Sequence, residues 1–186
     1  MHICIIDKDD ARDCLTSLQT PTTTAQVLPK ANDGVDLNAL SYEIMWRYAK
    51  TQLLCRNSVI VDCPLARREL FQQGRCLAAQ ASAVVVVVEC IASNAAVWQA
   101  RLEARASVEA ETEKGHKPNS WADLRALLER YNGCDRWSTD GTSEIEHYIQ
   151  VDTTTGQSQP EITAGLIDAL SSKGLLPQVD CVRKIS

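Results

Sequence analysis

The apolar positions of the chain gather into short runs that end abruptly at polar residues. Three strand segments, 3–6, 58–61 and 83–90, contain the continuous apolar runs 3–6, 59–61 and 83–88, and a fourth segment with strand character covers 145–151. Continuous apolar runs are typical of strands that are buried on both faces of a parallel sheet. An aspartate follows three of the four segments, at Asp7, Asp62 and Asp152.

Between these strands the apolar positions recur at helical spacing. Leu37, Leu40, Ile44 and Tyr48 share one face of a predicted helix that runs from Asp36 to about Leu54. Further helices are predicted over residues 65–81, 94–105, 120–131 and 160–174. Asn94 is suited to cap the second of these, and Ser120 with Asp123 resembles a capping box at the start of the third.

Strands and helices alternate, which predicts an α/β fold with a three-layer α/β/α arrangement around a mostly parallel sheet. The length of 186 residues fits a single domain over 1–186. Three segments interrupt the pattern: a Thr-, Pro- and Asn-rich loop at 16–35, a polar segment at 106–120 and a tail at 175–186.

Composition narrows the class of protein. The formal net charge of −5 and the lack of a basic block disfavour nucleic acid as a partner. Eight cysteines are present without a Cys-x-x-Cys pair or a histidine cluster, so a zinc site is not expected. The most apolar stretch, 83–88, is too short to span a membrane. These features predict a cytoplasmic protein with no membrane partner.

The aspartates that follow the strands are the first candidates for residues of a binding or catalytic site. In open parallel sheets, ligands bind beyond the carboxyl ends of the strands. Asp7, Asp62 and Asp152 are therefore expected to gather around one cleft, which favours a cation or phosphate site. The alternative for Asp62 is a structural role, in which it caps the next helix or turn.

The order of several short motifs resembles that of small P-loop kinases. Asp9-Asp10-Ala11-Arg12 resembles their Asp-x-x-Arg element, and residues 58–62 resemble the Walker B strand. Arg101 and Arg105 with the following polar segment resemble the start of the lid, and residues 148–154 resemble the last strand and the loop near the adenine. The chain is thus similar to AAA-domain, kinase-like P-loop proteins of the plant type, within the group of polynucleotide kinases, gluconate kinases and zeta toxins.

This resemblance implies a role for each matched residue. Asp9 would accept the proton of an attacking hydroxyl, and Arg12 would orient the acceptor. Asp62 would hold Mg²⁺, while Arg101 and Arg105 would spread the charge of the transferred phosphoryl group. Asp152 and Thr153 would lie near the bound ATP. The structural alternatives are helix capping for Asp9 and a solvated helix face for the two arginines.

The chain lacks the phosphate-binding motif of this family. No Gly-x-x-x-x-Gly-Lys-Ser/Thr is present in the 186 residues. In the family, this motif and the first strand precede the strand that opens this chain, so the match predicts a truncated domain, whether by truncation, an alternative start or an incorrect gene model. The missing strand would leave two apolar strands with unpaired edges, open to self-association.

Two classes of function follow from these features. One is an ATP-dependent phosphotransferase that acts on an unknown hydroxyl-bearing acceptor, with impaired ATP binding in this chain. The other is a non-catalytic interaction protein, or a truncated isoform of the kinase. The acceptor itself cannot be chosen from the resemblance, because one such scaffold serves many substrates.

Overall fold

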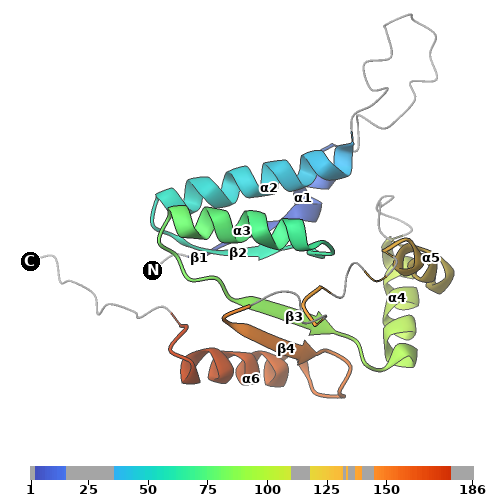
Figure 1. The fold of residues 1–186 in the computed structure, drawn as a ribbon. Coiled ribbons are helices and arrows are strands. Elements are labelled where there is room, and N and C mark those ends of the chain that lie inside the picture. The colour runs from blue at the N-terminus through green and yellow to red at the C-terminus, as the bar shows by residue number, and fades with distance from the viewer. Residues whose placement is uncertain are drawn as a thin grey trace, which may run out of the picture. The chain divides into compact units, whose positions relative to one another are not determined.

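The fold is given by a computed structural model that describes residues 3–15, 36–109, 118–131, 133, 137–139 and 145–176. Its helices and strands follow one another in the predicted order, with one addition, a short helix directly after the first strand that was not predicted (Figure 1). They are β1 (Ile3–Asp7), α1 (Lys8–Cys14), α2 (Leu37–Leu54), β2 (Ser58–Asp62), α3 (Arg68–Gln80), β3 (Val87–Ile91), α4 (Ala95–Glu109), α5 (Trp121–Tyr131), β4 (Tyr148–Asp152) and α6 (Gln159–Ser172). The predicted loop at 16–35 and residues 110–117 and 177–186 of the other two predicted segments lie outside the described residues.

The chain divides into two compact units. The first comprises residues 1–64 and 73–83, and the second comprises residues 65–72 and 84–186. The boundary passes through α3, whose first turn belongs to the second unit and whose remainder belongs to the first. The prediction that 1–186 forms one domain therefore stays a prediction, and each unit is described by itself.

The first unit is built on the parallel pair β1–β2. The two strands are in register from Ile3 opposite Ser58 to Asp7 opposite Asp62. Helix α2 packs against both strands, and α1 packs against α2. Because both strands run in the same direction, their two terminal aspartates lie side by side at one edge of the sheet.

One face of this strand pair remains exposed, although continuous burial was predicted. Ile3, Ile5 and Ile60 retain 50%, 72% and 50% of their surface. Side chains alternate between the two faces of a strand, so these three residues share the face that Asp7 and Asp62 also occupy. The prediction that these strands are buried on both faces is therefore wrong for the described residues.

The buried face of α2 is rotated by one residue from the predicted one. Met45 and Ser41 are fully buried and Ala49 is 2% exposed, whereas Tyr48 is 62% exposed. With Leu37, the buried positions are spaced four apart, as one helix face requires. Ser41 is accommodated because its hydroxyl donates to the Asn38 carbonyl at 2.7 Å, a local bond that the hydrophobic pattern does not reveal.

The second unit is built on the parallel pair β3–β4, with Val87 opposite Tyr148 and Ile91 opposite Asp152. Helix α6 packs against β4, and α4 packs against α5. Strand β3 begins at Val87 and not at residue 83 as predicted, because His147 provides the first acceptor, for the Val87 N–H at 2.9 Å. The earlier valines form the connection that precedes the strand.

Trp137 fixes the start of the second unit. Its ring stacks on Phe71 with the centroids 4.9 Å apart, and its indole N–H donates to the Leu65 carbonyl at 2.7 Å. Leu65 has a φ of 47°, a left-handed conformation that is strained in a residue with a branched side chain. The contacts of Trp137, which is 5% exposed, hold this conformation in place.

The helix starts follow the predicted capping chemistry. The Asn94 side chain accepts from the N–H groups of Ala96 and Val97, and the Ser120 hydroxyl accepts from the Asp123 N–H at 3.1 Å. None of the helices in the described ranges combines the length and hydropathy that a membrane span requires. Parallel strands alternating with helices confirm the predicted α/β class.

Candidate functional site

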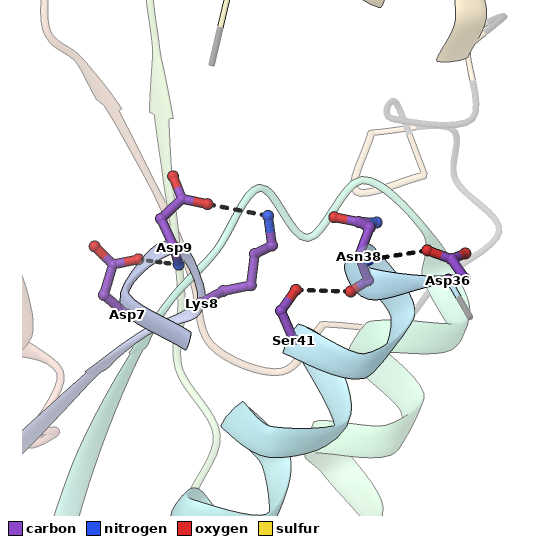
Figure 2. A network of polar contacts seen from close by, with 6 residues as sticks. All are labelled: Asp7, Lys8, Asp9, Asp36, Asn38 and Ser41. Carbon is purple, nitrogen blue, oxygen red and sulfur yellow. Dashed lines mark hydrogen bonds and ion pairs between the residues drawn. The ribbon is translucent and has the colours of Figure 1, made fainter. Parts of the chain in front are cut away.

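The carboxyl end of β1 continues directly into α1. Oδ1 of Asp7 accepts from the Asp9 N–H at 2.7 Å, which caps the helix (Figure 2). The capping role considered for Asp9 is thus filled by Asp7. The Asp9 carboxylate instead accepts from Nζ of Lys8 at 3.0 Å. Asp9 is left partly exposed, on the first turn of α1.

Lys8 is held in an unusual environment for a lysine. The residue is only 5% exposed, and its Nζ lies 5.5 Å from the centroid of the Tyr42 ring, within the range of a cation–π contact. Lysines are rarely buried without a partner, and here the partner is Asp9. The ion pair places a positive charge directly beside the Asp9 carboxylate.

Asp62 lies beside Asp7 in the register of the strand pair and is exposed. Helix α3 begins six positions further on, at Arg68, so Asp62 does not cap it. Asp62 therefore lies at the sheet edge, in register with the residue that caps α1. Within the described residues no group of three or more His, Cys, Asp and Glu side chains is arranged to hold a metal ion.

Arg12 lies in the last turn of α1 and is 8% exposed. Its Nη1 has no hydrogen-bond partner among the described residues. Asp9 and Arg12 are three positions apart on α1, a spacing that puts their side chains on neighbouring parts of the helix surface. The first unit thus contains four candidate residues that the sequence analysis named: Asp7, Asp9, Arg12 and Asp62.

Asp152 closes β4 in the second unit, where its carboxylate accepts hydrogen bonds from two loops. The Ser93 hydroxyl donates to Oδ2, and the Ser93 N–H donates to Oδ1 at 3.3 Å. The N–H and the hydroxyl of Thr154 also donate to Oδ1, at 2.8 and 2.7 Å. These hydrogen bonds, led by that from Ser93, hold the pKa of Asp152 well below its usual range.

Thr153 and Thr154 extend this network to α4. Thr153 donates to the Ile91 carbonyl through both its N–H, at 2.9 Å, and its hydroxyl, at 3.0 Å. The Thr154 hydroxyl oxygen accepts from the Asn94 N–H at 3.0 Å. Nη1 of Arg101 donates to the Thr153 carbonyl at 2.6 Å. The end of β4 and the start of α4 are therefore joined by a set of short-range polar contacts.

Arg105 lies one turn after Arg101 on α4 and is also exposed. Its Nη2 donates to the Pro118 carbonyl at 3.0 Å, which ties α4 to the segment that leads into α5. The predicted lid at 106–120 begins within α4 and ends at Ser120, and its middle part, 110–117, lies outside the described residues. Both lid arginines thus contact backbone carbonyls at the ends of neighbouring elements.

Several residues of these networks were not singled out from the sequence. Lys8 and Ser93 are first identified by their contacts in the structure, and Thr154, which lies in the segment 148–154 singled out above, had no individual role. The only signal for Ser93 is its place just after β3, at the same sheet edge as Asp152. A second missed group lies on β3 and β4: Glu89 accepts from the Tyr148 hydroxyl and from the Ser138 hydroxyl.

The predicted site residues fall into two sets. Asp9, Arg12 and Asp62 belong to the first unit, whereas Arg101, Arg105, Asp152 and Thr153 belong to the second. The structure brings Asp7 and Asp62 together, as expected for the ends of parallel strands. A single cleft that includes Asp152 stays a prediction.

Comparisons with known proteins identify the family and the type of fold. The family model described as an AAA domain matches residues 1–130. The fold is similar to a crystal structure described as a "putative kinase" from Chloroflexus aurantiacus J-10-fl, with 17% sequence identity, a TM-score of 0.58 and coverage of 94% of this chain and 85% of that chain. No curated protein matches the chain. The fold is of the P-loop kinase type, and the chain belongs to the AAA-domain family of P-loop NTPase-type proteins.

Proposed function

We propose that the chain is a kinase-like phosphotransferase domain that supplies the acceptor-binding and magnesium-binding residues of an ATP-dependent reaction. The observation that supports this most is the edge of the β1–β2 pair, where Asp7 and Asp62 lie in register and Asp9 opens the following helix. The carboxyl ends of parallel strands are where open α/β proteins bind ligands.

Asp9 is proposed to accept the proton of the acceptor hydroxyl. The Asp9 carboxylate lies on the first turn of α1, 3.0 Å from Nζ of Lys8, at the sheet edge where a bound hydroxyl could donate its proton to it. Because Asp7 caps α1, the Asp9 side chain is not the capping group of the helix and is held instead by its ion pair with Lys8. Arg12, on the same helix, is proposed to orient the acceptor.

Asp62 is proposed to hold Mg²⁺ that is shared with the phosphates of the nucleotide. Mg²⁺ in such proteins is bound by one or two carboxylates, with water and phosphate oxygens completing its shell. An exposed carboxylate beside Asp7 fits that donor set, and a cluster of three acidic residues is not required. When bound, the ion neutralises charge on the phosphates.

Arg101 and Arg105 are proposed to contact the transferred phosphoryl group. Each now donates to a neutral carbonyl, of Thr153 and Pro118 respectively. Phosphate oxygens are stronger acceptors for a guanidinium than carbonyl oxygens, so both contacts can be exchanged for a charged ligand. Asp152 and Thr153 are proposed to lie near the nucleotide base, with the Asp152 carboxylate engaged by Ser93 and Thr154.

This chain is proposed to bind ATP weakly or not at all. The phosphate-binding loop supplies a cradle of N–H groups and a lysine to the β- and γ-phosphates, and no such motif is present in the 186 residues. A thermal melt of the chain with and without excess MgATP tests this. We expect a cooperative transition whose midpoint does not move.

An upward shift of several degrees would show that nucleotide binds without the loop. Transfer from labelled ATP to a panel of hydroxyl acceptors would then be compared between the wild type, Asp9→Asn and Asp10→Asn. Loss of transfer with Asp9→Asn alone supports the proposed base. Equal transfer by all three proteins would refute it.

A second candidate function is self-association through the β1–β2 pair. The exposure of Ile3, Ile5 and Ile60 on one face favours it, because apolar faces of this kind are commonly covered by a partner. Sedimentation velocity of the wild type and of Ile5→Lys tests it. A dimer that dissociates in the variant supports association, and a monomeric wild type contradicts it.

A further inference from the structure

Residues 137–139 form a short strap in the second unit. Its first residue, Trp137, stacks on Phe71 and donates its indole N–H to the Leu65 carbonyl at 2.7 Å. Both aromatic residues are only 5% exposed, so the strap closes this contact to solvent. Leu65 has a φ of 47°, a strained conformation that can relax when Trp137 leaves. The strain at Leu65 therefore favours release of the strap.

The second residue of the strap is bound to a carboxylate. Ser138 donates its hydroxyl to Oε2 of Glu89 at 3.1 Å. The same oxygen accepts from the hydroxyl of Tyr148, to which Nε2 of Gln150 donates at 3.2 Å. Glu89 lies on β3, and Tyr148 and Gln150 lie on the neighbouring strand β4. The strap is thus attached to the strand pair by a neutral hydroxyl that faces a negative charge.

We propose that Ser138 is a phosphorylation site and that its phosphate releases the strap. A phosphoserine carries a charge of about −1.5 to −2 at neutral pH and has no hydroxyl left to donate. At the position of the Ser138 hydroxyl, that charge would meet the negative charge of Glu89, and like-charge repulsion would open the contact. Glu89 would keep the hydrogen bond from Tyr148, so departure of the strap does not leave this carboxylate without a donor.

The modifying enzyme would be a protein kinase that uses ATP. Its reaction breaks the bond between the γ-phosphorus and the bridging oxygen of ATP and joins this phosphorus to Oγ of Ser138. ADP leaves, and the hydroxyl proton passes to the base of the enzyme. In the sequence, Arg136 precedes Ser138 by two positions. This cation suits protein kinases with an acidic substrate groove, because the charge pattern around the serine is one basis of their specificity.

Release of the strap also removes the contacts of Trp137 with residues 65–72. Leu65 follows Asp62 by three positions in the chain. Where the proposed phosphotransfer holds, phosphorylation would loosen the chain next to the residue proposed to bind Mg²⁺ and would lower that activity. This consequence rests on the proposed function, whereas release of the strap is measured without nucleotide.

The first experiment follows hydrogen exchange at the indole N–H of Trp137 by NMR. The 186-residue chain is prepared unmodified, with phosphoserine at position 138 or with phosphoserine at position 107. Loss of the signal in Trp137→Phe assigns it. We expect phosphate on Ser138 to accelerate this exchange by about tenfold or more, because local opening sets the exchange rate and repulsion between close charges favours opening.

Ser107 is the matched control for the added charge. It is an exposed serine of α4 in the same unit, and its hydroxyl donates to a neutral group, the Ala104 carbonyl, at 2.7 Å. Phosphate on Ser107 should leave exchange at Trp137 unchanged. The indole N–H of Trp46, which is buried in the first unit, is the internal reference and should exchange at the same rate in every protein.

Glu89→Gln tests whether charge opens the strap. In the protein with phosphoserine at 138, this change removes the opposing charge and keeps an oxygen that accepts from Tyr148. It should therefore restore most of the protection at Trp137. If the phosphate acted by its size alone, Glu89→Gln would restore none of it.

The second experiment tests the modification itself. The folded, unmodified chain is incubated with MgATP and a protein kinase that selects a basic residue two positions before serine, and mass spectrometry of its peptides locates the phosphate. A sample without the protein kinase is the control. We expect phosphate on Ser138, and a lower rate in Arg136→Ala.

Three results would overturn the proposal. The first is a folded chain that receives no phosphate on Ser138. The second is exchange at Trp137 that phosphate on Ser138 leaves unchanged, or that phosphate on Ser107 accelerates equally. The third is equal acceleration at Trp46, or protection that Glu89→Gln does not restore. The chain's own activity enters neither experiment, so failure of the proposed phosphotransfer leaves these results unchanged.

Discussion

The Ser93 N–H donates to Oδ1 of Asp152 at 3.3 Å, and the Ser93 hydroxyl donates to the other carboxylate oxygen. These residues are 59 positions apart and follow or close two neighbouring strands, β3 and β4. Thr154 completes the contact by accepting from the Asn94 N–H at the cap of α4. Asp152 thus organises the polar edge of the second unit.

Asp152→Asn is expected to lower the Tm near neutral pH, because an amide presents an N–H₂ group to donors that now face a carboxylate. The pKa of Asp152 is lower in the folded state than in the unfolded state. Its contribution to the stability of the fold is therefore complete above the unfolded pKa of about 3.9 and declines as the pH falls below that value. The difference in Tm between wild type and variant should therefore shrink below about pH 4.

The control for this pH series is Asp168→Asn, at an exposed position of α6 in the same unit. In thermal melts at a series of pH values, the difference in Tm between the wild type and Asp168→Asn should be small and should not change with pH. A wild-type advantage over Asp152→Asn that stays constant in acid would contradict the assigned role of the carboxylate.

Tyr148 is expected to ionise above the usual tyrosine pKa of about 10. Burial raises its pKa first, and the hydrogen bond to Glu89 and the negative charge of Glu89 raise it further. Its contribution to stability is present below the unfolded pKa and is lost as the pH rises through the folded value. Subtracting the near-ultraviolet titration of Tyr148→Phe from that of the wild type isolates this group.

Glu89→Gln provides the matched comparison for Tyr148. It removes the charge but retains an oxygen that can accept from the tyrosine hydroxyl. The midpoint of the Tyr148 titration should fall towards the usual value in this variant. An unchanged midpoint would show that Glu89 does not influence the tyrosine.

Trp137→Phe is expected to destabilise the protein by about 1–3 kcal/mol, because the Leu65 carbonyl loses its indole donor. Trp137→Ala should cost more, about 3–5 kcal/mol, since the stack on Phe71 is also lost. Urea denaturation followed by far-ultraviolet circular dichroism measures both. Leu128→Ala, at an exposed position of α5, is the control and should change stability by no more than about 0.5 kcal/mol.

Met45→Ala and Tyr48→Ala distinguish the observed face of α2 from the predicted one. Met45 is fully buried, so its truncation should cost about 2–5 kcal/mol. Tyr48 is 62% exposed, and its loss should cost roughly 0.5 kcal/mol or less. Urea denaturation of the two variants provides the comparison, and the reverse order would support the face predicted from the hydrophobic pattern.

Local chemistry made the ends of elements predictable. Asn94 and Ser120 cap helices as expected, because a capping side chain bonds to N–H groups two or three residues away. The aspartates that close β1, β2 and β4 were found in the same way, since a charged residue ends an apolar run. The start of β3 was predicted too early, because a run of identical valines does not indicate at which residue pairing with the neighbouring strand begins.

The site was predictable only in part. The sequence identified Asp9, Asp62 and Arg101 through a resemblance in motif order, and their roles stay proposals. It did not indicate that Lys8 would be buried against Tyr42 or that Ser93 would bond to Asp152. Both contacts depend on segments that are distant in the chain, which neither periodicity nor capping patterns describe.

The sequence by itself determined the order of the strands and of the helices other than α1, several of their capping residues and the membership of the chain in its family. These depend on interactions among residues that are close along the chain. Tertiary structure decided which face of α2 is buried, which strands pair and that Lys8 and Arg12 are buried. Those outcomes follow from packing and from the matching of charges between separate segments, and they exist only once the segments have come together.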